Sequence, residues 1–162
     1  MLRAMRQLEL RRHAPRDPSA DRLSDAGRAR AMEVGRSQQD IVYAAVFVSP
    51  AARAAETVAW LLRGAGQQLP LAHSVVPGLA GKDPTEGSPE GMATGIGSLL
   101  ERVPEGGRGL AISHTPFVER AALGLTGHEV EPMRECEGLL ITLRDDGDIE
   151  VQELRLPGST AR

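Results

Sequence analysis

The sequence predicts a three-layer α/β/α sandwich, in which helices cover both faces of a mostly parallel central sheet with a hairpin at one edge. Short apolar runs alternate with longer helical segments along the chain, and this alternation is typical of parallel strands joined by crossover helices. The last two apolar runs flank an Asp-Gly turn at residues 145–148, which indicates the hairpin. A length of 162 residues without internal repeats fits a single domain spanning 1–162.

The first half of the chain shows helix and strand signals in strict alternation. We expect a strand over 7–12, a helix over 25–39, a strand over 44–48, a helix over 50–63 and a weaker strand over 69–76. Ser24 supplies an N-cap for the first helix, whose small apolar residues recur about every three positions. Pro50 suits the first turn of the second helix, because its missing N–H has no intrahelical partner there.

The second half begins with residues 77–89, which are rich in Gly, Pro and polar residues and are expected to form a loop. Next come a helix over 90–103, a buried strand over 109–113 and a helix that opens at His114-Thr-Pro116 and runs to about 125. Strands over 138–143 and 149–156 form the final hairpin.

The amino-acid composition argues against nucleic acids and membranes as binding partners. The net charge is −3 and aromatic residues make up 2%, which disfavours a nucleic-acid binder built on basic patches or stacked bases. No apolar run approaches the ~20 residues of a membrane span, and the charged N-terminus does not look like a signal peptide. With Cys136 as the sole cysteine, no intrachain disulfide can form. We therefore expect a cytoplasmic protein without nucleic-acid or membrane partners.

Polar residues that can bind phosphate follow three of the expected strands. The first strand ends at Arg12 and His13, the second is followed by Arg53 in its helix, and the fourth ends at Ser113 and His114. Carboxyl ends of parallel strands share one edge of the sheet, where ligands of open α/β folds bind. A neutral imidazole can attack phosphorus, and guanidinium groups match phosphate oxygens. This pattern predicts a phosphoryl-transfer site on His13.

No metal or other cofactor is expected at this site. His13 and His114 have no third ligand at a suitable spacing, and the neighbouring arginines would repel a cation. Charge on the phosphate would be stabilised by the arginines, and helix N-termini after Ser49 and His114 would add backbone N–H donors.

Three blocks of sequence resemble the histidine phosphatase superfamily, the phosphoglycerate-mutase-like proteins. The segment Leu-Arg-Arg-His-Ala at 10–14 resembles the Arg-His-Gly signature, and Arg-Leu-Ser-Asp-Ala-Gly at 22–27 resembles the following helix start. Val-Ser-Pro-Ala-Ala-Arg-Ala-Ala-Glu-Thr at 48–57 and Ile-Ser-His-Thr-Pro at 112–116 resemble the second and third blocks. The resemblance implies that His13 is phosphorylated and that Arg12, Arg53 and His114 form the phosphate pocket.

The interval at 77–89 is short, and in this respect the chain resembles the compact SixA-type phosphohistidine phosphatases. Those phosphatases act on a histidine-phosphorylated signalling protein. Mutases of the superfamily carry a long insertion there with a general acid. Asp83 and Glu86 are the candidate acids in this chain, and Arg16 and Ser113 are candidate substrate-binding residues. Ala14 replaces the usual Gly, which suggests that this position does not need positive φ.

Two alternatives to a phosphohistidine phosphatase remain open. The chain could act on small sugar or nucleotide phosphates, or it could bind phosphate without turnover, since no general acid matches the family pattern. A mutase is disfavoured, because the short loop could hardly enclose the cavity that isomerisation requires.

Overall fold

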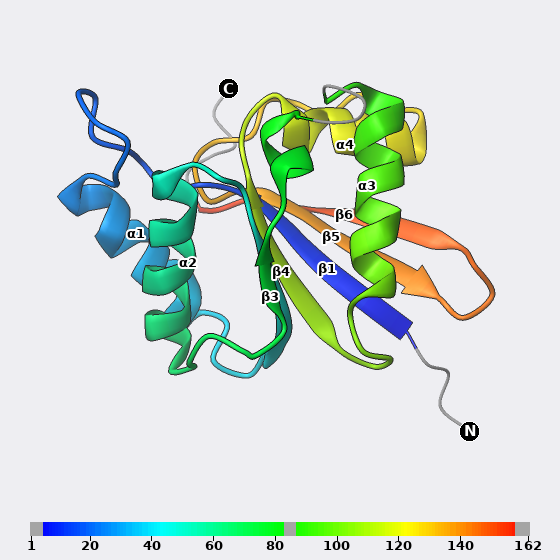
Figure 1. Ribbon diagram of the computed structural model, residues 1–162, viewed down its shortest axis with the longest axis horizontal. Helices are drawn as coiled ribbons and strands as arrows, with labels where there is room; N and C mark the ends of the chain where they lie inside the picture. The colour runs from blue at the N-terminus through cyan, green and yellow to red at the C-terminus, as the bar shows by residue number, and fades with distance from the viewer. Residues whose placement is uncertain (1–4, 83–86, 158–162) are drawn as a thin grey trace.

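The computed structural model describes residues 5–82 and 87–157 and shows a central sheet between two layers of helices (Figure 1). In chain order the elements are β1 (Met5–Arg12), α1 (Asp25–Arg36), β2 (Tyr43–Val48), α2 (Ala52–Ala65), β3 (His73–Val75), the 3₁₀ helix η1 (Pro77–Ala80), α3 (Pro89–Glu101), β4 (Arg108–Ser113), α4 (Phe117–Thr126), β5 (Gly138–Arg144) and β6 (Ile149–Leu154). No helix in the described ranges is long and apolar enough to cross a membrane.

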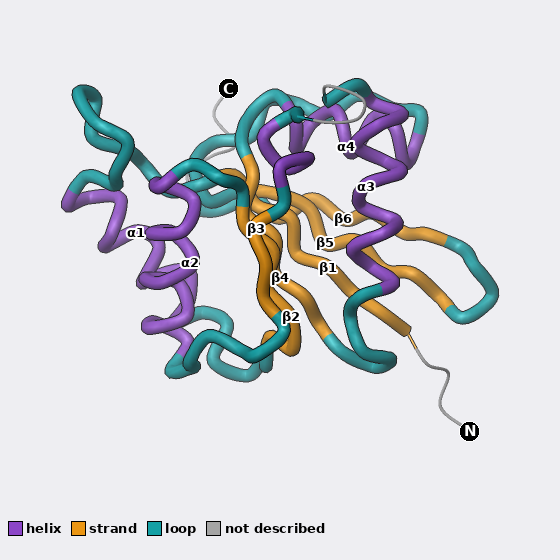
Figure 2. Tube along the Cα trace, in the orientation of Figure 1, coloured by secondary structure: helices purple, strands orange, loops and turns teal. Residues whose placement is uncertain are grey.

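The sheet has six strands in the order β3-β2-β4-β1-β5-β6 (Figure 2). The strands β3, β2, β4 and β1 pair in parallel, whereas β5 runs antiparallel to β1 and forms a hairpin with β6 at the edge. The helices α1 and α2 lie on one face, and α3 and α4 lie on the other. The predicted three-layer sandwich with an edge hairpin is confirmed.

Each face of the sheet has its own core, and β1 shows how the sequence divides them. Leu8 and Leu10 are fully buried in the core beneath α3 and α4. Glu9 and Arg11 alternate with them and project toward the opposite face, as the period of two along a strand requires. That face packs against α1 and α2 through a second cluster, which includes Leu61 on α2.

Several predicted boundaries are corrected by the structure. The helix α1 ends at Arg36 rather than near 39, because the Ser37 hydroxyl donates to the Val34 carbonyl and closes the last turn. Pro50 precedes α2 instead of opening it, since Ala51 is the N-cap. The segment expected to be only a loop contains η1, and β3 is shorter than predicted, with only three residues paired to β2.

The β6 strand also ends earlier than predicted, at Leu154. The backbone N–H of Leu156 donates to the buried Glu137 carboxylate over 3.0 Å, so the chain leaves the edge of the sheet at this point.

Glycine substitutions test how closely α1 and α2 pack. A Cβ at Gly64 would lie 2.0 Å from the Met32 carbonyl oxygen, whereas a Cβ at Gly97 on α3 meets nothing within 4 Å. We expect Gly97→Ala to raise the free energy of unfolding by about 0.5–1 kcal/mol, because alanine loses less backbone entropy in a helix. Gly64→Ala should lower it by about 1–3 kcal/mol, because the helices must separate. Urea denaturation of both variants measures the difference, and an equal effect of the two would contradict the close packing.

Candidate active site

The strand register brings the predicted site residues to one edge of the sheet. Arg12 in β1 is paired with Ser113 in β4, and Val48 in β2 is paired with Ile112. Just beyond the strands, the His13 N–H donates to the Ser113 carbonyl over 3.1 Å. The residues that follow β1, β2 and β4 therefore meet at the carboxyl end of the sheet, as predicted.

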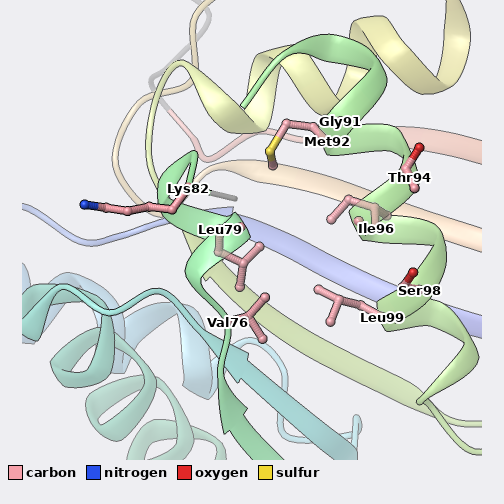
Figure 3. A pocket seen from close by; sticks show the side chains of 11 residues that line it. Val76, Leu79, Lys82, Gly91, Met92, Thr94, Ile96, Ser98 and Leu99 are labelled. Atoms are coloured by element: carbon pink, nitrogen blue, oxygen red, sulfur yellow. The ribbon is translucent and has the colours of Figure 1, made fainter. Parts of the chain in front are cut away.

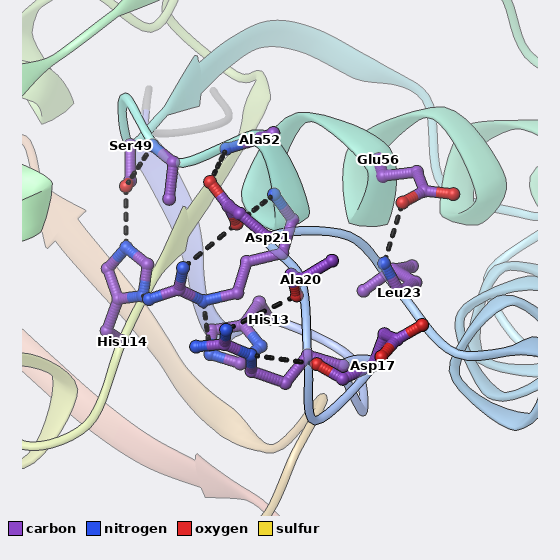
Figure 4. Close-up of polar contacts among 12 residues, drawn as sticks. His13, Asp17, Ala20, Asp21, Leu23, Ser49, Ala52, Glu56 and His114 are labelled. Carbon is purple, nitrogen blue, oxygen red and sulfur yellow. Dashed lines mark hydrogen bonds and ion pairs between the residues drawn. The ribbon is translucent and has the colours of Figure 1, made fainter.

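The Arg53 guanidinium contacts three side chains of this cluster, His13, His114 and Asp21, which are labelled in Figure 4. Its Nε donates to Nε2 of His13 and its Nη2 lies against Nδ1 of His114, both over 3.3 Å. Its Nη1 donates to Asp21 over 2.9 Å. The two imidazole rings meet edge to face, with centroids 5.2 Å apart. The structure thus brings together the three side chains that sequence analysis placed at separate strand ends.

The hydrogen bonds fix the tautomer of each histidine. Nδ1 of His13 lies 2.8 Å from the Ala14 carbonyl, which can only accept, so this nitrogen carries the proton and Nε2 keeps a lone pair. A guanidinium can only donate, so Nδ1 of His114 accepts from Arg53. Nε2–H of His114 then donates to Ser49 Oγ over 2.6 Å. The His13 lone pair is directed toward Arg53.

Both histidines are held in the neutral form. Burial lowers the pKa of His13 from its ordinary value of 6.5, and the charges of Arg53 and Arg12 lower it further. Burial, His13 and Arg53 together lower the pKa of His114 to about 4. A nucleophilic imidazole must be unprotonated, so this environment keeps His13 available at neutral pH.

These shifts predict the pH profile of turnover. Because the pKa of His13 is lowered, its neutral form persists below pH 6.5, and the acid limb of kcat/KM should fall below that pH. The measurement is kcat/KM for p-nitrophenyl phosphate against pH, corrected for ionisation of the substrate. An acid limb at or above pH 6.5 would show that His13 does not have the lowered pKa.

Arg12 contributes an unused hydrogen-bond donor beside His13. Its Nη1 donates to the Met133 carbonyl over 2.8 Å, and its Nη2 lies 3.6 Å from the Glu135 carboxylate. Its Nε is buried and has no partner among the described residues. A buried unpaired donor costs about 1–3 kcal/mol, so the atom is poised to bind an acceptor such as a phosphate oxygen.

Asp21 is a site residue that sequence analysis missed. Its carboxylate accepts the backbone N–H groups of Ala52 and Arg53 over 2.9 and 3.0 Å, besides the Arg53 guanidinium. Burial alone would raise the pKa of Asp21, but these hydrogen bonds outweigh it and lower the pKa. The predicted use of the α2 N-terminus for phosphate is therefore wrong for this structure, because Asp21 occupies those donors.

A second carboxylate holds the Asp21 loop against α2. Glu56 accepts the backbone N–H of Leu23 over 2.7 Å (Figure 4). It also accepts from the Nε of Arg28 over 2.7 Å. At the same place the Pro15 backbone packs closely against Gly27 in the first turn of α1, where a Cβ would lie 1.9 Å from the Pro15 carbonyl oxygen. The resemblance blocks at 22–27 and 48–57 thus contact each other and position the loop that carries Asp21.

The remaining predicted residues have different positions. Arg16 is exposed and donates to the carbonyls of Asp17 and Ala20 in its own loop. Among the described residues, its side chain forms no hydrogen bond with His13, Arg53 or His114. Ser113 is fully buried and its hydroxyl donates to the Leu79 carbonyl over 2.6 Å, so it anchors η1 to β4 and does not face a substrate. The candidate acids Asp83 and Glu86 lie outside the described residues.

Ala14 fits where the family pattern has glycine. It is fully buried, and its N–H donates to Thr57 Oγ1 over 3.0 Å. Within residues 5–82 and 87–157, Cys136 is the one non-glycine residue with positive φ. The expectation that position 14 does not need positive φ is confirmed.

A separate cavity of about 280 Å³ lies between η1 and α3, lined mainly by apolar residues such as Leu79, Met92 and Ile96 (Figure 3). The lining includes none of the predicted catalytic residues. This apolar cavity is therefore separate from the predicted phosphate site, the polar cluster at the strand ends.

Neither a scan against protein-family models nor a search of curated proteins finds a match. Solved structures do match. A structure of the protein histidine phosphatase SixA complexed with tungstate is 23% identical, with a TM-score of 0.73, covering 92% of this chain and 96% of that one. A phosphoglycerate mutase from Bacillus anthracis is 15% identical, with a TM-score of 0.75, covering 94% and 93%. A phosphoserine phosphatase from Entamoeba histolytica in complex with 3-phosphoglyceric acid is 14% identical, with a TM-score of 0.69, covering 93% and 98%.

The chain has the histidine phosphatase fold. This finding confirms, at the level of the fold, the resemblance that three sequence blocks predicted. In the histidine phosphatase fold of this chain, His13, Arg53 and His114 lie together at the carboxyl ends of β1, β2 and β4.

Proposed function

We propose that this protein is a metal-independent phosphatase that forms a covalent phosphohistidine on His13. The observation that carries the proposal is the His13 imidazole itself, whose Nε2 lone pair points to Arg53 while Nδ1 is fixed by the Ala14 carbonyl. The unpaired Nε of Arg12 supplies a further donor for a phosphate oxygen. The solved structures of similar fold include phosphatases, which agrees with this activity.

The reaction follows from the geometry of these groups. A phosphate group would displace the long contacts between Arg53 and the two imidazoles and bind the arginine donors in their place. Nε2 of His13 attacks phosphorus, the bond to the leaving group breaks, and water then hydrolyses the phosphohistidine. Arg12, Arg53 and His114 stabilise the negative charge on the transferring group, which is the main requirement of phosphoryl transfer.

For the substrate, we propose a phosphohistidine of a signalling protein. SixA, a protein histidine phosphatase, is among the similar structures and matches this chain over almost the full length of both. Only residues 76–88 separate β3 from α3. A segment of this length leaves no long insertion to enclose the site, and this favours a macromolecular substrate. A small-molecule phosphatase is the alternative that a substrate comparison decides.

The experiment is to trap the phosphoenzyme. The protein is mixed with a phosphodonor, quenched under alkaline conditions that preserve phosphohistidine, and analysed by peptide mass spectrometry. We expect phosphate on the peptide that contains His13, none on the peptide that contains His73, and undiminished turnover in EDTA. Turnover without label on His13 at any quench time would overturn the covalent route, and binding of phosphate without turnover would support a non-catalytic protein.

The substrate proposal has its own measurement. Rates of phosphate release are compared between a histidine-phosphorylated phosphotransfer domain and a panel of sugar and nucleotide phosphates. We expect kcat/KM for the phosphorylated domain to exceed that for each metabolite. A sugar or nucleotide phosphate with the higher kcat/KM would favour the small-molecule phosphatase.

A further inference from the structure

A carboxylate that sequence analysis did not single out lies beside the proposed nucleophile. Glu135 is 3.6 Å from Nη2 of Arg12, and its side chain keeps 37% of its surface exposed. Its negative charge acts on His13, where it opposes the lowering of the pKa by the arginines. Glu135 therefore lies at the solvent side of the pocket, within reach of both Arg12 and the surroundings of His13.

The backbone around Glu135 is fastened to the end of β1. The N–H of Cys136 donates to the carbonyls of Arg12 and His13 over 3.0 and 3.3 Å, and the N–H of Arg12 donates to the Glu137 carbonyl over 2.8 Å. Arg11 adds a bond from Nη1 to the Cys136 carbonyl over 2.7 Å. The turn that carries Glu135 is therefore bonded directly to the backbone of the proposed nucleophile.

The same turn contains an unfavourable backbone conformation. Cys136 has φ of 70°, the left-handed region in which a Cβ is disfavoured. Such strain persists only where the surrounding bonds impose it, and it is common at functional sites. Burial raises the pKa of the Cys136 thiol to about 12, so the thiol is not a reactive group at neutral pH. The bonds that hold Cys136 in this conformation also position Glu135, whose carboxylate lies 3.6 Å from Nη2 of Arg12.

We propose that Glu135 is the general acid that protonates the leaving group. This inference rests on the proposed phosphatase function. A phosphate bound to Arg12 would lie next to the Glu135 carboxyl group, because Arg12 contacts Glu135 over 3.6 Å. A carboxyl group within reach of the leaving atom can serve as its proton donor.

Asp21 is unsuited to this role. Its carboxylate accepts three hydrogen bonds from α2 and Arg53, which stabilise the anion. A group held as an anion by three donors is a poor proton donor. Asp21 is instead a positioning residue that acts through Arg53, whereas Glu135 has one ion pair and an exposed edge.

The proton balance of the proposed cycle is complete. As the His13 Nε2 lone pair forms the N–P bond, the bond from phosphorus to the leaving atom breaks and its electron pair takes the proton of Glu135. Glu135 is then a carboxylate. It accepts a proton from the water that attacks phosphorus, the N–P electron pair returns to His13, and inorganic phosphate leaves with Glu135 protonated again.

The test compares two substrates of nearly equal size, p-nitrophenyl phosphate and phenyl phosphate. Nitrophenolate leaves readily without a proton, whereas phenolate, like the tyrosine side chain with an ordinary pKa near 10, is the poorer leaving group. In Glu135→Gln we expect kcat/KM for phenyl phosphate to fall about 10²-fold or more, with less than about a tenfold fall for p-nitrophenyl phosphate. The readout is a ratio from one preparation, so partial unfolding cancels.

Two further variants serve as controls. Glu131→Gln makes the same chemical change at an exposed position of the same loop, and both rates should stay at the wild-type level. Asp21→Asn should lower both rates by the same factor. An unchanged ratio in Glu135→Gln would overturn the role of Glu135 as acid, while label on His13 in the trapping experiment would leave the phosphatase proposal intact.

Discussion

The His13→Ala variant is expected to lose phosphate-ester hydrolysis by about 10⁴- to 10⁶-fold, the loss that follows removal of a catalytic nucleophile. Nε2 of His13 keeps its lone pair directed toward Arg53, because the other ring nitrogen carries the proton and orients the ring through the Ala14 carbonyl. Alanine removes that atom but leaves Arg53 and His114 in place. Phosphate should therefore still bind, so KM should change far less than kcat.

Steady-state hydrolysis of p-nitrophenyl phosphate and calorimetric binding of inorganic phosphate measure the two effects separately. His73→Ala is the matched control, because His73 lies in the edge strand β3 and its Nδ1 contacts only the nearby Pro70 carbonyl among the described residues. Its activity should equal that of the wild type. A His13→Ala protein that keeps more than about a hundredth of the wild-type kcat would exclude His13 as the nucleophile.

The sequence allowed the sheet and its edge to be predicted because the relevant signals are local. Alternation along β1, the buried run of β4 and the Asp-Gly turn of the hairpin each depend on neighbouring residues. Element ends were harder, because tertiary bonds decide them. The Leu156 N–H donates to the Glu137 carboxylate, so β6 ends before Leu156. Glu137 is 19 positions away in the sequence, so the residues around Leu156 do not indicate this bond.

Some residues of the candidate site could likewise be predicted from the sequence, and others could not. Residues directly after strands, such as His13 and His114, could be placed because the carboxyl ends of parallel strands meet. Asp21 could not, since its partners Ala52 and Arg53 lie 31 and 32 positions away across a loop. The predicted role of Ser113 in substrate binding was wrong because its partner is also distant in the sequence. Its position at a strand end suggested substrate contact, but the structure packs η1 over its hydroxyl.

Beneath the site, a buried charge network supports the turn that carries Glu135. Glu9 is fully buried and accepts from Arg11 Nε over 2.9 Å, from Arg108 Nη1 over 2.5 Å and from the Tyr43 hydroxyl over 2.9 Å. Burial and the Glu9 charge raise the pKa of Tyr43, so its hydroxyl stays protonated as a donor. Arg11 in turn donates to the Cys136 carbonyl. Glu9 thus neutralises the cation that fixes the strained turn.

Glu9→Gln should lower the free energy of unfolding by about 3–5 kcal/mol, because removing one partner of a buried ion pair leaves its cations uncompensated in a medium that solvates them poorly. Glutamine keeps the size of the side chain, so lost packing does not account for the effect. Urea denaturation measures the change, with Glu150→Gln as the control. Glu150 pairs with Arg144 at the exposed hairpin, where an ion pair contributes less than about 1 kcal/mol. Equal losses in the two variants would mean that the buried network contributes no more than a surface pair, and Arg11 would then need no counterion to hold the turn.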